Sequence, residues 1–165
     1  PWLLLLMISA TFTTLIISSF ESALAAHIIL TSFIPMIMGT GGNSGSQSSV
    51  TIIRGLSLDE IEFADILRVI WKETRVAILC GLTLAVANFF KLILFEGVEI
   101  AISLTISVTL LITVLVAKVI GSSLPMLAKK IGFDPAVMAS PLITTMVDAL
   151  SLLVYFTTAT ALLGI

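Results

Sequence analysis

The sequence predicts an all-α, polytopic membrane protein with five transmembrane helices in each protomer. Of its 165 residues, 58% are hydrophobic and 11% are charged, whereas soluble domains average roughly 45–50% apolar and about 25% charged residues. A chain with so few charges cannot cover itself with a hydrated surface. Apolar runs of about 20 residues, the length that a helix needs to cross a bilayer, also recur along the whole chain.

Five apolar runs mark the expected spans. They are residues 2–20, 23–39, 76–95, 100–120 and 135–163. Glu21 and Ser22 mark a tight turn after the first span, and the second span leads into a polar stretch over residues 40–49. The spans and their short connections account for nearly the whole chain, so the sequence predicts one transmembrane domain over residues 1–165.

The segment between the second and third spans has a different pattern. Ser57 and Glu60 have the spacing of a helix-starting capping box. The apolar residues that follow recur at helical intervals, with charged residues between them: Phe63, Ile66, Leu67, Ile70 and Trp71. This pattern predicts an amphipathic helix at the membrane surface, either a connector beneath the bundle or a gating element that contacts a partner domain.

The positions of Lys and Arg predict the orientation. With the N-terminus inside, only Lys91 falls on the outer side. The others fall on the inner side: Arg54, Arg68, Lys72, Arg75, Lys118, Lys129 and Lys130. Because positive residues favour the cytoplasmic side, we expect a multi-pass protein of the cell membrane with its N-terminus in the cytoplasm and its C-terminus outside. Lys91 and Lys118 are expected to extend to the two interfaces.

Asp148 is the one acidic residue that the topology places in the membrane. Nine of the ten acidic residues, Glu73 among them, can be placed outside the membrane core. Asp148 follows Pro135 by 13 residues, about 20 Å along a helix, and no Lys or Arg lies at matching depth. An Asp at a helix centre costs about 2.5–3.5 kcal/mol on insertion scales. Asp148 is therefore expected to be protonated, to reach water or to hold a mobile cation.

One face of the fifth span is polar around Asp148. A helical projection groups six residues within about 100° of arc: Ser140, Ser151, Thr144, Tyr155, Asp148 and Pro141. Pro141 cannot donate to the carbonyl of Val137, which is left as a further oxygen ligand. Oxygen donors suit Mg²⁺ and Ca²⁺. The alternative for Ser140, Thr145 and Ser151 is that each forms hydrogen bonds between helices without a role in transport.

The second polar feature is the Gly-rich run over residues 39–47. Its chemistry rests on Gly41, Gly42, Gly45, Asn43 and Gln47. Glycine lets the backbone approach a ligand or another helix closely, and Asn43 and Gln47 share one helical face. Pro35, upstream, leaves the carbonyl of Thr31 without its helical donor. We expect this run to lie on the cytoplasmic side of Asp148, with Asn43 facing the ion path.

Several function classes are disfavoured by the same sequence. A net charge of −2 offers no basic surface for nucleic acid. A single Cys80 and a single His27 cannot form a disulfide or a zinc cluster. No nucleophile–base pair is visible, so we predict no enzymatic activity, no catalytic residue and no bound organic cofactor.

The two polar motifs together resemble the signature of the MgtE family of magnesium transporters. The first comprises Pro35, Gly41-Gly42-Asn43, Gly45, Gln47 and Arg54-Gly55. The second comprises Asp134-Pro135-Ala136, Ser140-Pro141, Thr144-Thr145, Asp148 and Tyr155-Phe156. The resemblance covers essentially the whole chain. Family members often carry a cytoplasmic N-terminal domain and a pair of CBS domains before the first helix, and neither is present in this chain.

The resemblance implies a domain that dimerises and a pore lined by the second and fifth helices. Asp148 matches the central Mg²⁺ site of the family, with carbonyl groups near Ser140 and Thr144 as further ligands and Asn43 near the pore. The expected metal site is thus Asp148, Ser140, Thr144 and Asn43. The expected pore lining is Pro35, Gly41, Gly42, Gly45, Gln47, Pro141, Thr145 and Ser151.

We therefore predict channel-like transport of divalent cations, chiefly Mg²⁺, by a homodimer in a lipid bilayer. Mn²⁺, Co²⁺ and Ca²⁺ are further candidate ions, because the sequence does not distinguish among these divalent cations. One alternative is a Mg²⁺ exporter or a Na⁺-coupled exchanger of the same family. Another is a membrane anchor or assembly subunit that transports nothing, in which Asp148 would be protonated or paired across a helix interface.

Overall fold

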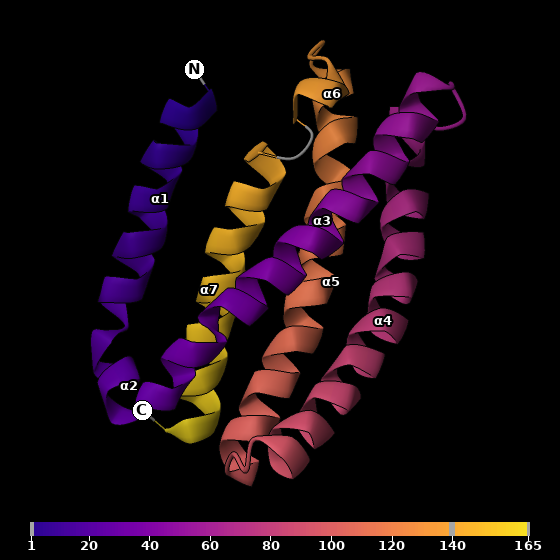
Figure 1. Cartoon of the computed structure of the whole chain (residues 1–165). Coiled ribbons are helices and arrows are strands. Elements are labelled where there is room, and N and C mark those ends of the chain that lie inside the picture. The colour runs from indigo at the N-terminus through magenta and orange to yellow at the C-terminus, as the bar shows by residue number, and fades with distance from the viewer. Residues whose placement is uncertain (1, 139–140, 165) are drawn as a thin grey trace.

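A computed structural model describes residues 2–138 and 141–164, and every regular element in them is a helix. The elements in chain order are α1 (Trp2–Ser19), α2 (Glu21–Ala26), η1 (Ile28–Phe33), α3 (Ile34–Ser57), η2 (Phe63–Asp65), α4 (Ile66–Phe95), α5 (Ile100–Lys130), α6 (Pro135–Met138) and α7 (Pro141–Leu163). Figure 1 shows α4, α5 and α7 side by side, with α3 crossing them diagonally and α1 at the edge next to α7.

Three of the helices are long and apolar enough to span a bilayer. They cover Phe63–Phe95, Ile100–Lys130 and Pro141–Leu163, with 33, 31 and 23 residues. At about 1.5 Å per residue, each exceeds the roughly 30 Å thickness of the hydrocarbon core. The third, fourth and fifth predicted spans are therefore found as helices, and the prediction of an all-α membrane protein is confirmed at this level.

The second predicted span differs from expectation. Instead of one helix over residues 23–39, the chain forms α2, the 3₁₀ segment η1 and then α3, which continues through the whole Gly-rich run to Ser57. Pro35 lies in the first turn of α3, where its missing N–H costs no hydrogen bond. The carbonyl of Thr31 is not free, because it accepts a bond from the N–H of Ile34. The prediction of a carbonyl freed by Pro35 was wrong.

The expected separate amphipathic helix is also absent from the described residues. Its residues form η2 and the first turns of α4, which continues without a break into the third span. The capping box is made by Glu62 and Asp65, not by Ser57 and Glu60, because Ser57 is the last residue of α3 and its hydroxyl donates to the carbonyl of Ile53. The charged residues therefore lie at the start of a helix that is long and apolar enough to span a membrane.

The fifth predicted span is helical on both sides of residues 139–140, as α6 up to Met138 and as α7 from Pro141. How the chain passes between them lies outside the described residues, and so does the predicted interruption of the helix at Pro141. Ala139 and Ser140 lie outside the described residues, and so does the predicted ligand role of Ser140.

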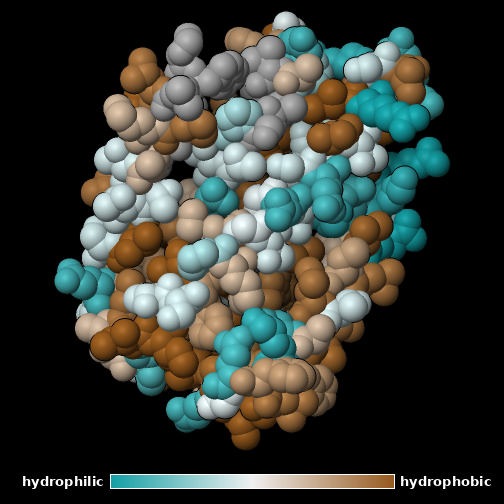
Figure 2. Space-filling model, viewed as in Figure 1, coloured by the Kyte–Doolittle hydropathy of each residue, from teal (hydrophilic) through white to brown (hydrophobic). Residues whose placement is uncertain are grey.

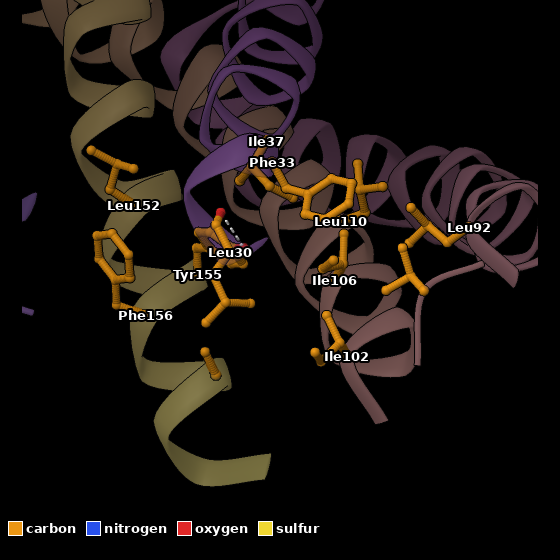
Figure 3. Close-up of a cluster of buried hydrophobic side chains, with 12 residues drawn as sticks. Leu30, Phe33, Ile37, Leu92, Ile102, Ile106, Leu110, Leu152, Tyr155 and Phe156 are labelled. Carbon is orange, nitrogen blue, oxygen red and sulfur yellow. Dashed lines mark hydrogen bonds between the residues drawn. The ribbon is translucent and has the colours of Figure 1, made fainter. Parts of the chain in front are cut away.

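The main core lies at the end of the bundle that holds the C-terminus. Large buried side chains from η1, α3, α5 and α7 form it, and Figure 3 shows Leu30, Phe33, Ile37, Ile106, Leu152 and Phe156 in this cluster. The hydroxyl of Tyr155 donates to the carbonyl of Leu30 over 2.8 Å. This bond ties α7 to the 3₁₀ segment, so the break between α2 and α3 is held by the core.

Candidate functional site

Asp148 lies on α7, seven residues after Pro141 and so about 10 Å along the helix. Its side chain is half-buried and lines a cavity of about 370 Å³ between α1, α3 and α7. Thr13 and Thr14 of α1, Met38 of α3 and Thr144 of α7 line the same cavity. Asp148 is the only charged residue among the described residues that line it. A carboxylate surrounded by hydroxyl groups can accept a hydrated cation or a proton.

The Gly-rich run brings α3 against this part of α7. A Cβ atom added at Gly42 would lie 3.3 Å from Oδ1 of Asp148 and 3.8 Å from Cγ2 of Thr144. A Cβ at Gly41 would overlap Oγ of Ser151 and lie 2.9 Å from Cγ2 of Thr113. Glycine is thus required here by space rather than by backbone angle. The predicted close approach of this run to another helix is confirmed.

Asn43 and Gln47 do not lie on the side of α3 that faces Asp148. Both are exposed, and both line a groove of about 700 Å³ between α3 and α4, as their spacing on one helical face predicted. Thr40 and Ser44 join them on the α3 wall, whereas Val76, Leu79 and Leu84 are among the residues of the α4 wall. The chain therefore brings Gly42 to Asp148 but does not bring Asn43 to it within one protomer.

The other predicted site residues take three kinds of position. Thr144 and Thr145 are half-buried beside Asp148 in the cavity, and the hydroxyl of Thr144 donates to the carbonyl of Pro141 over 3.1 Å. Ser151 is buried in the contact with Gly41 and donates to Val147 within its own helix. Pro35 is exposed at the start of α3. Of these, Thr144 and Thr145 share the cavity of Asp148.

A buried charged network that the sequence reading missed joins three helices. Ser48 of α3 donates a short hydrogen bond to Oε2 of Glu73 on α4. Nζ of Lys118 on α5 lies 3.2 Å from Oγ of Ser48 and 3.3 Å from Oε2 of Glu73. Lys118 was expected to extend to the interface and Glu73 to lie outside the core, but both are 8% exposed. The number of residues between each of them and the α4–α5 turn is similar, and this could have indicated that Glu73 and Lys118 lie at a similar depth and pair.

The polar surface around these features lies at one end of the bundle. Figure 2 shows hydrophilic residues gathered at the upper right, over the C-terminal part of α3 and the start of α4, and brown apolar residues over most of the lower part. No group of three His, Cys, Asp or Glu residues that could hold a metal occurs in the described residues. One protomer therefore offers a divalent ion a single carboxylate at Asp148, with neutral oxygen atoms around it.

Comparisons with known proteins agree with this reading. The family model MgtE, described as a divalent cation transporter, matches residues 34–158. The magnesium transporter MgtE of Thermus thermophilus is 36% identical over 162 residues, 98% of this chain and 36% of that protein. The Bacillus subtilis magnesium transporter MgtE is 37% identical over 161 residues, again 98% of this chain and 36% of that protein.

A third relative extends the comparison to another organism. The magnesium transporter MgtE of Enterococcus faecalis is 34% identical over 162 residues, 96% of this chain and 35% of that protein. The chain thus spans about a third of the length of the curated relatives that it matches. The resemblance carried by the two polar motifs is confirmed.

Proposed function

This chain belongs to the MgtE family of divalent cation transporters, and on that premise we propose that it conducts divalent cations, chiefly Mg²⁺, across a membrane past Asp148. The observation that carries the proposal is the contact between α3 and α7, where Gly42 leaves the carboxylate of Asp148 open to a cavity. Membership of a transporter family agrees with the prediction that the chain is not an enzyme.

The proposed topology has five spans, in which α1 and α3 cross the membrane beside α4, α5 and α7. The polar composition of α3 fits a helix whose faces contact protein and an ion path rather than lipid. Lys129 and Lys130 end α5, and Arg54 lies near the end of α3, at the same end of the bundle as the N-terminus. The positive-inside rule then places that end in the cytoplasm.

The proposed ion site uses two copies of the chain. Each protomer supplies one Asp148, and two carboxylates near a two-fold axis would balance the charge of one Mg²⁺. Thr144 and the carbonyl groups near Ser140 would complete the surroundings, and the polar residues Asn43 and Gln47 would continue the path along α3. Mg²⁺ dehydrates reluctantly and keeps several waters, so we propose a hydrated ion held through water as much as through direct contact.

The driving force for inward flow is the membrane potential. An inside-negative potential supplies about 2.3 kcal/mol per elementary charge for each 100 mV, which is doubled for a divalent ion. Ion flow then needs no chemical fuel and no coupled ion. Uptake that requires a Na⁺ gradient in addition to a voltage would contradict this channel-like mechanism and favour an exchanger.

Mg²⁺ uptake by proteoliposomes tests the proposal. Asp148→Asn keeps the size of the side chain but removes the charge, and we expect it to lose most of the Mg²⁺ flux of the parent protein. Asp148→Glu, which keeps the charge one methylene further out, should retain part of the flux if contact through water dominates. Parental flux in Asp148→Asn would remove Asp148 from the ion site.

The anchor alternative is tested by binding rather than by flux. A ligand that binds only the folded protein raises its stability by RT ln(1 + [L]/Kd). We expect millimolar Mg²⁺ to raise the unfolding temperature of the parent protein, and to raise that of Asp148→Ala less. No shift in either protein, together with no flux, would favour an anchor or assembly subunit.

A further inference from the structure

The buried network of Ser48, Glu73 and Lys118 lies deeper than a surface ion pair. The side chains of Lys118 and Glu73 are 11% and 10% exposed. Lys118 lies 18 residues, about 27 Å, from the start of α5, and Glu73 lies 22 residues, about 33 Å, from the end of α4. Asp148 lies 15 residues, about 22 Å, from the end of α7. Figure 1 places those three helix ends at the same end of the bundle, so the network lies nearer than Asp148 to the opposite end, which the proposed topology places in the cytoplasm.

Lys118 also lines the groove between α3 and α4. It shares that groove with Asn43 and Gln47, and it is the only charged residue among the described residues that line it. The groove thus combines a wall of neutral oxygen and nitrogen atoms on α3 with one ammonium group. A positive charge beside the polar face of α3 would repel a divalent cation, because charge repulsion is strong where the effective dielectric constant is low.

A structural role alone does not require charges at these positions. Replacing a buried ion pair by apolar side chains of similar volume is often neutral or stabilising. The contact of α3 with α5 is in any case made by backbone, since a Cβ at Gly121 would overlap the carbonyl of Gly45. The Lys–Glu pair therefore calls for an explanation beyond holding the helices together.

We propose that Glu73 compensates the charge of Lys118 beside the cation path, so that the balance between these two residues sets the Mg²⁺ concentration at which transport is half-saturated. This inference rests on the proposed function. Ser48, which bonds to both, holds the ammonium and carboxylate groups in register with α3. Glu73 is thus a positioning residue that acts through Lys118, and Lys118 limits how strongly the groove attracts cations.

The test is the Mg²⁺ dependence of uptake by proteoliposomes containing the full chain. Glu73→Gln leaves the Lys118 charge uncompensated, so the half-saturating Mg²⁺ concentration should rise by about threefold to tenfold. Lys118→Gln leaves the Glu73 charge uncompensated, so that concentration should fall by a similar factor. The double variant Glu73→Gln/Lys118→Gln should fall between the two. Shifts of the same sign in both single variants, or no shift in either, would overturn the proposal, because a structural defect has no reason to change sign with charge.

Two controls keep the result interpretable. If either single variant does not fold, variants of Thr83 replace it, because Thr83 is exposed on α4 and lines the same groove. Thr83→Lys should raise the half-saturating Mg²⁺ concentration more than Thr83→Gln does. Equal values in the two variants would overturn the proposal. The parent and Asp148→Asn are measured in parallel. Absence of uptake by the parent overturns the proposed function and this inference with it, whereas parental uptake with shifts of one sign overturns this inference alone.

Discussion

The contact between α3 and α7 has two halves that are built in opposite ways. Towards the end that the proposed topology places outside, large side chains fill the space: Ile37 of α3 and Leu30 of the preceding η1 pack in one cluster with Leu152, Tyr155 and Phe156 of α7. Towards the other end, which that topology places inside, glycines let the two backbones approach, and small or polar side chains lie beside cavities. The same contact is thus filled by large apolar side chains at one end and leaves polar atoms accessible at the other.

The difference shows how a membrane protein can place a carboxylate at depth. Close packing of side chains in the outer half holds the helices without polar groups. Close approach of glycine backbones in the inner half needs no large side chains, so space remains for water or an ion next to Asp148. Under the proposed function, stability and ion access therefore depend on different segments of one helix pair, and substitutions in the two halves should have different effects.

The largest effect on stability is expected at Gly121, which supports the inner half through α5. Its added Cβ would overlap the carbonyl oxygen of Gly45 and lie 2.9 Å from the Cα of that residue. Gly121→Ala should lower the free energy of unfolding by about 3 kcal/mol or more, since backbone on both sides must move. Reversible unfolding in detergent measures it.

Gly39→Ala is the matched control for that experiment. No atom lies within 4 Å of a Cβ added at Gly39, and Ala is a better helix former than Gly by up to about 1 kcal/mol. Its free energy of unfolding should be unchanged or slightly raised. A loss of stability equal to that of Gly121→Ala would show that the backbone contact between α3 and α5 is not what makes Gly121 sensitive.

The next largest effect is on ion flux, at Gly42. Gly42→Val would place methyl groups against Asp148 and Thr144, and we expect it to abolish Mg²⁺ uptake in protein that remains folded. Gly39→Val, three residues earlier on the same helix, points into open space and should retain uptake. Equal flux in the two variants would remove the Gly-rich run from the ion path, and the family motif would then explain packing at this position.

A smaller effect is expected in the outer half, at Tyr155. Tyr155→Phe removes the hydroxyl that donates to the carbonyl of Leu30, and an intramolecular hydrogen bond contributes roughly 0.5–1.5 kcal/mol net. The unfolding temperature should fall, whereas Mg²⁺ dependence of uptake should change little, because the bond lies away from Asp148. A large shift in the half-saturating Mg²⁺ concentration would show that the two halves are coupled.

A comparable effect on stability is expected at the connection between α3 and α4, outside both halves of that contact. Asp59 has a φ of 54°, a left-handed conformation that β-branched residues rarely adopt. Asp59→Val should therefore lower the free energy of unfolding by about 1–2 kcal/mol, whereas Asp59→Asn, which tolerates this conformation, should change it by less than about 0.5 kcal/mol. Equal losses in the two variants would instead assign the effect to the lost charge near Lys129.

The sequence predicted the helices better than their ends. Hydrophobic runs placed the last three spans because apolar length alone decides whether a helix can cross a membrane. The starts and breaks were missed where local signals compete: Ser57 has the spacing of a helix start but ends α3, and Pro35 lies in the first turn of a helix rather than interrupting one. A Pro residue looks the same in the sequence whether it begins a helix or interrupts one, and only the surrounding packing decides between the two.

The candidate site was predicted in part. Asp148 was selected as a candidate because an acidic residue in a long apolar run is costly in a membrane, and the spacing of Asn43 and Gln47 placed them on one face. The pairing of Glu73 with Lys118 was not foreseen, because the two residues are 45 positions apart and each lies near the end of a predicted span, where a charged residue at the membrane interface is ordinary. Thr13 and Thr14 were missed for a similar reason, since hydroxyl residues in the first span carry no signal of their own.

The sequence by itself determined the membrane class, the family and the acidic residue Asp148 within a long apolar run, because composition, apolar length and short motifs are local properties of a chain. Only the tertiary structure decided which side of α3 faces Asp148, that Asn43 lies over a separate groove, and that Lys118 is buried against Glu73. The physical reason is that helix rotation and crossing are set by packing between distant segments. Glycines such as Gly45 and Gly121 act as partners only when those segments meet.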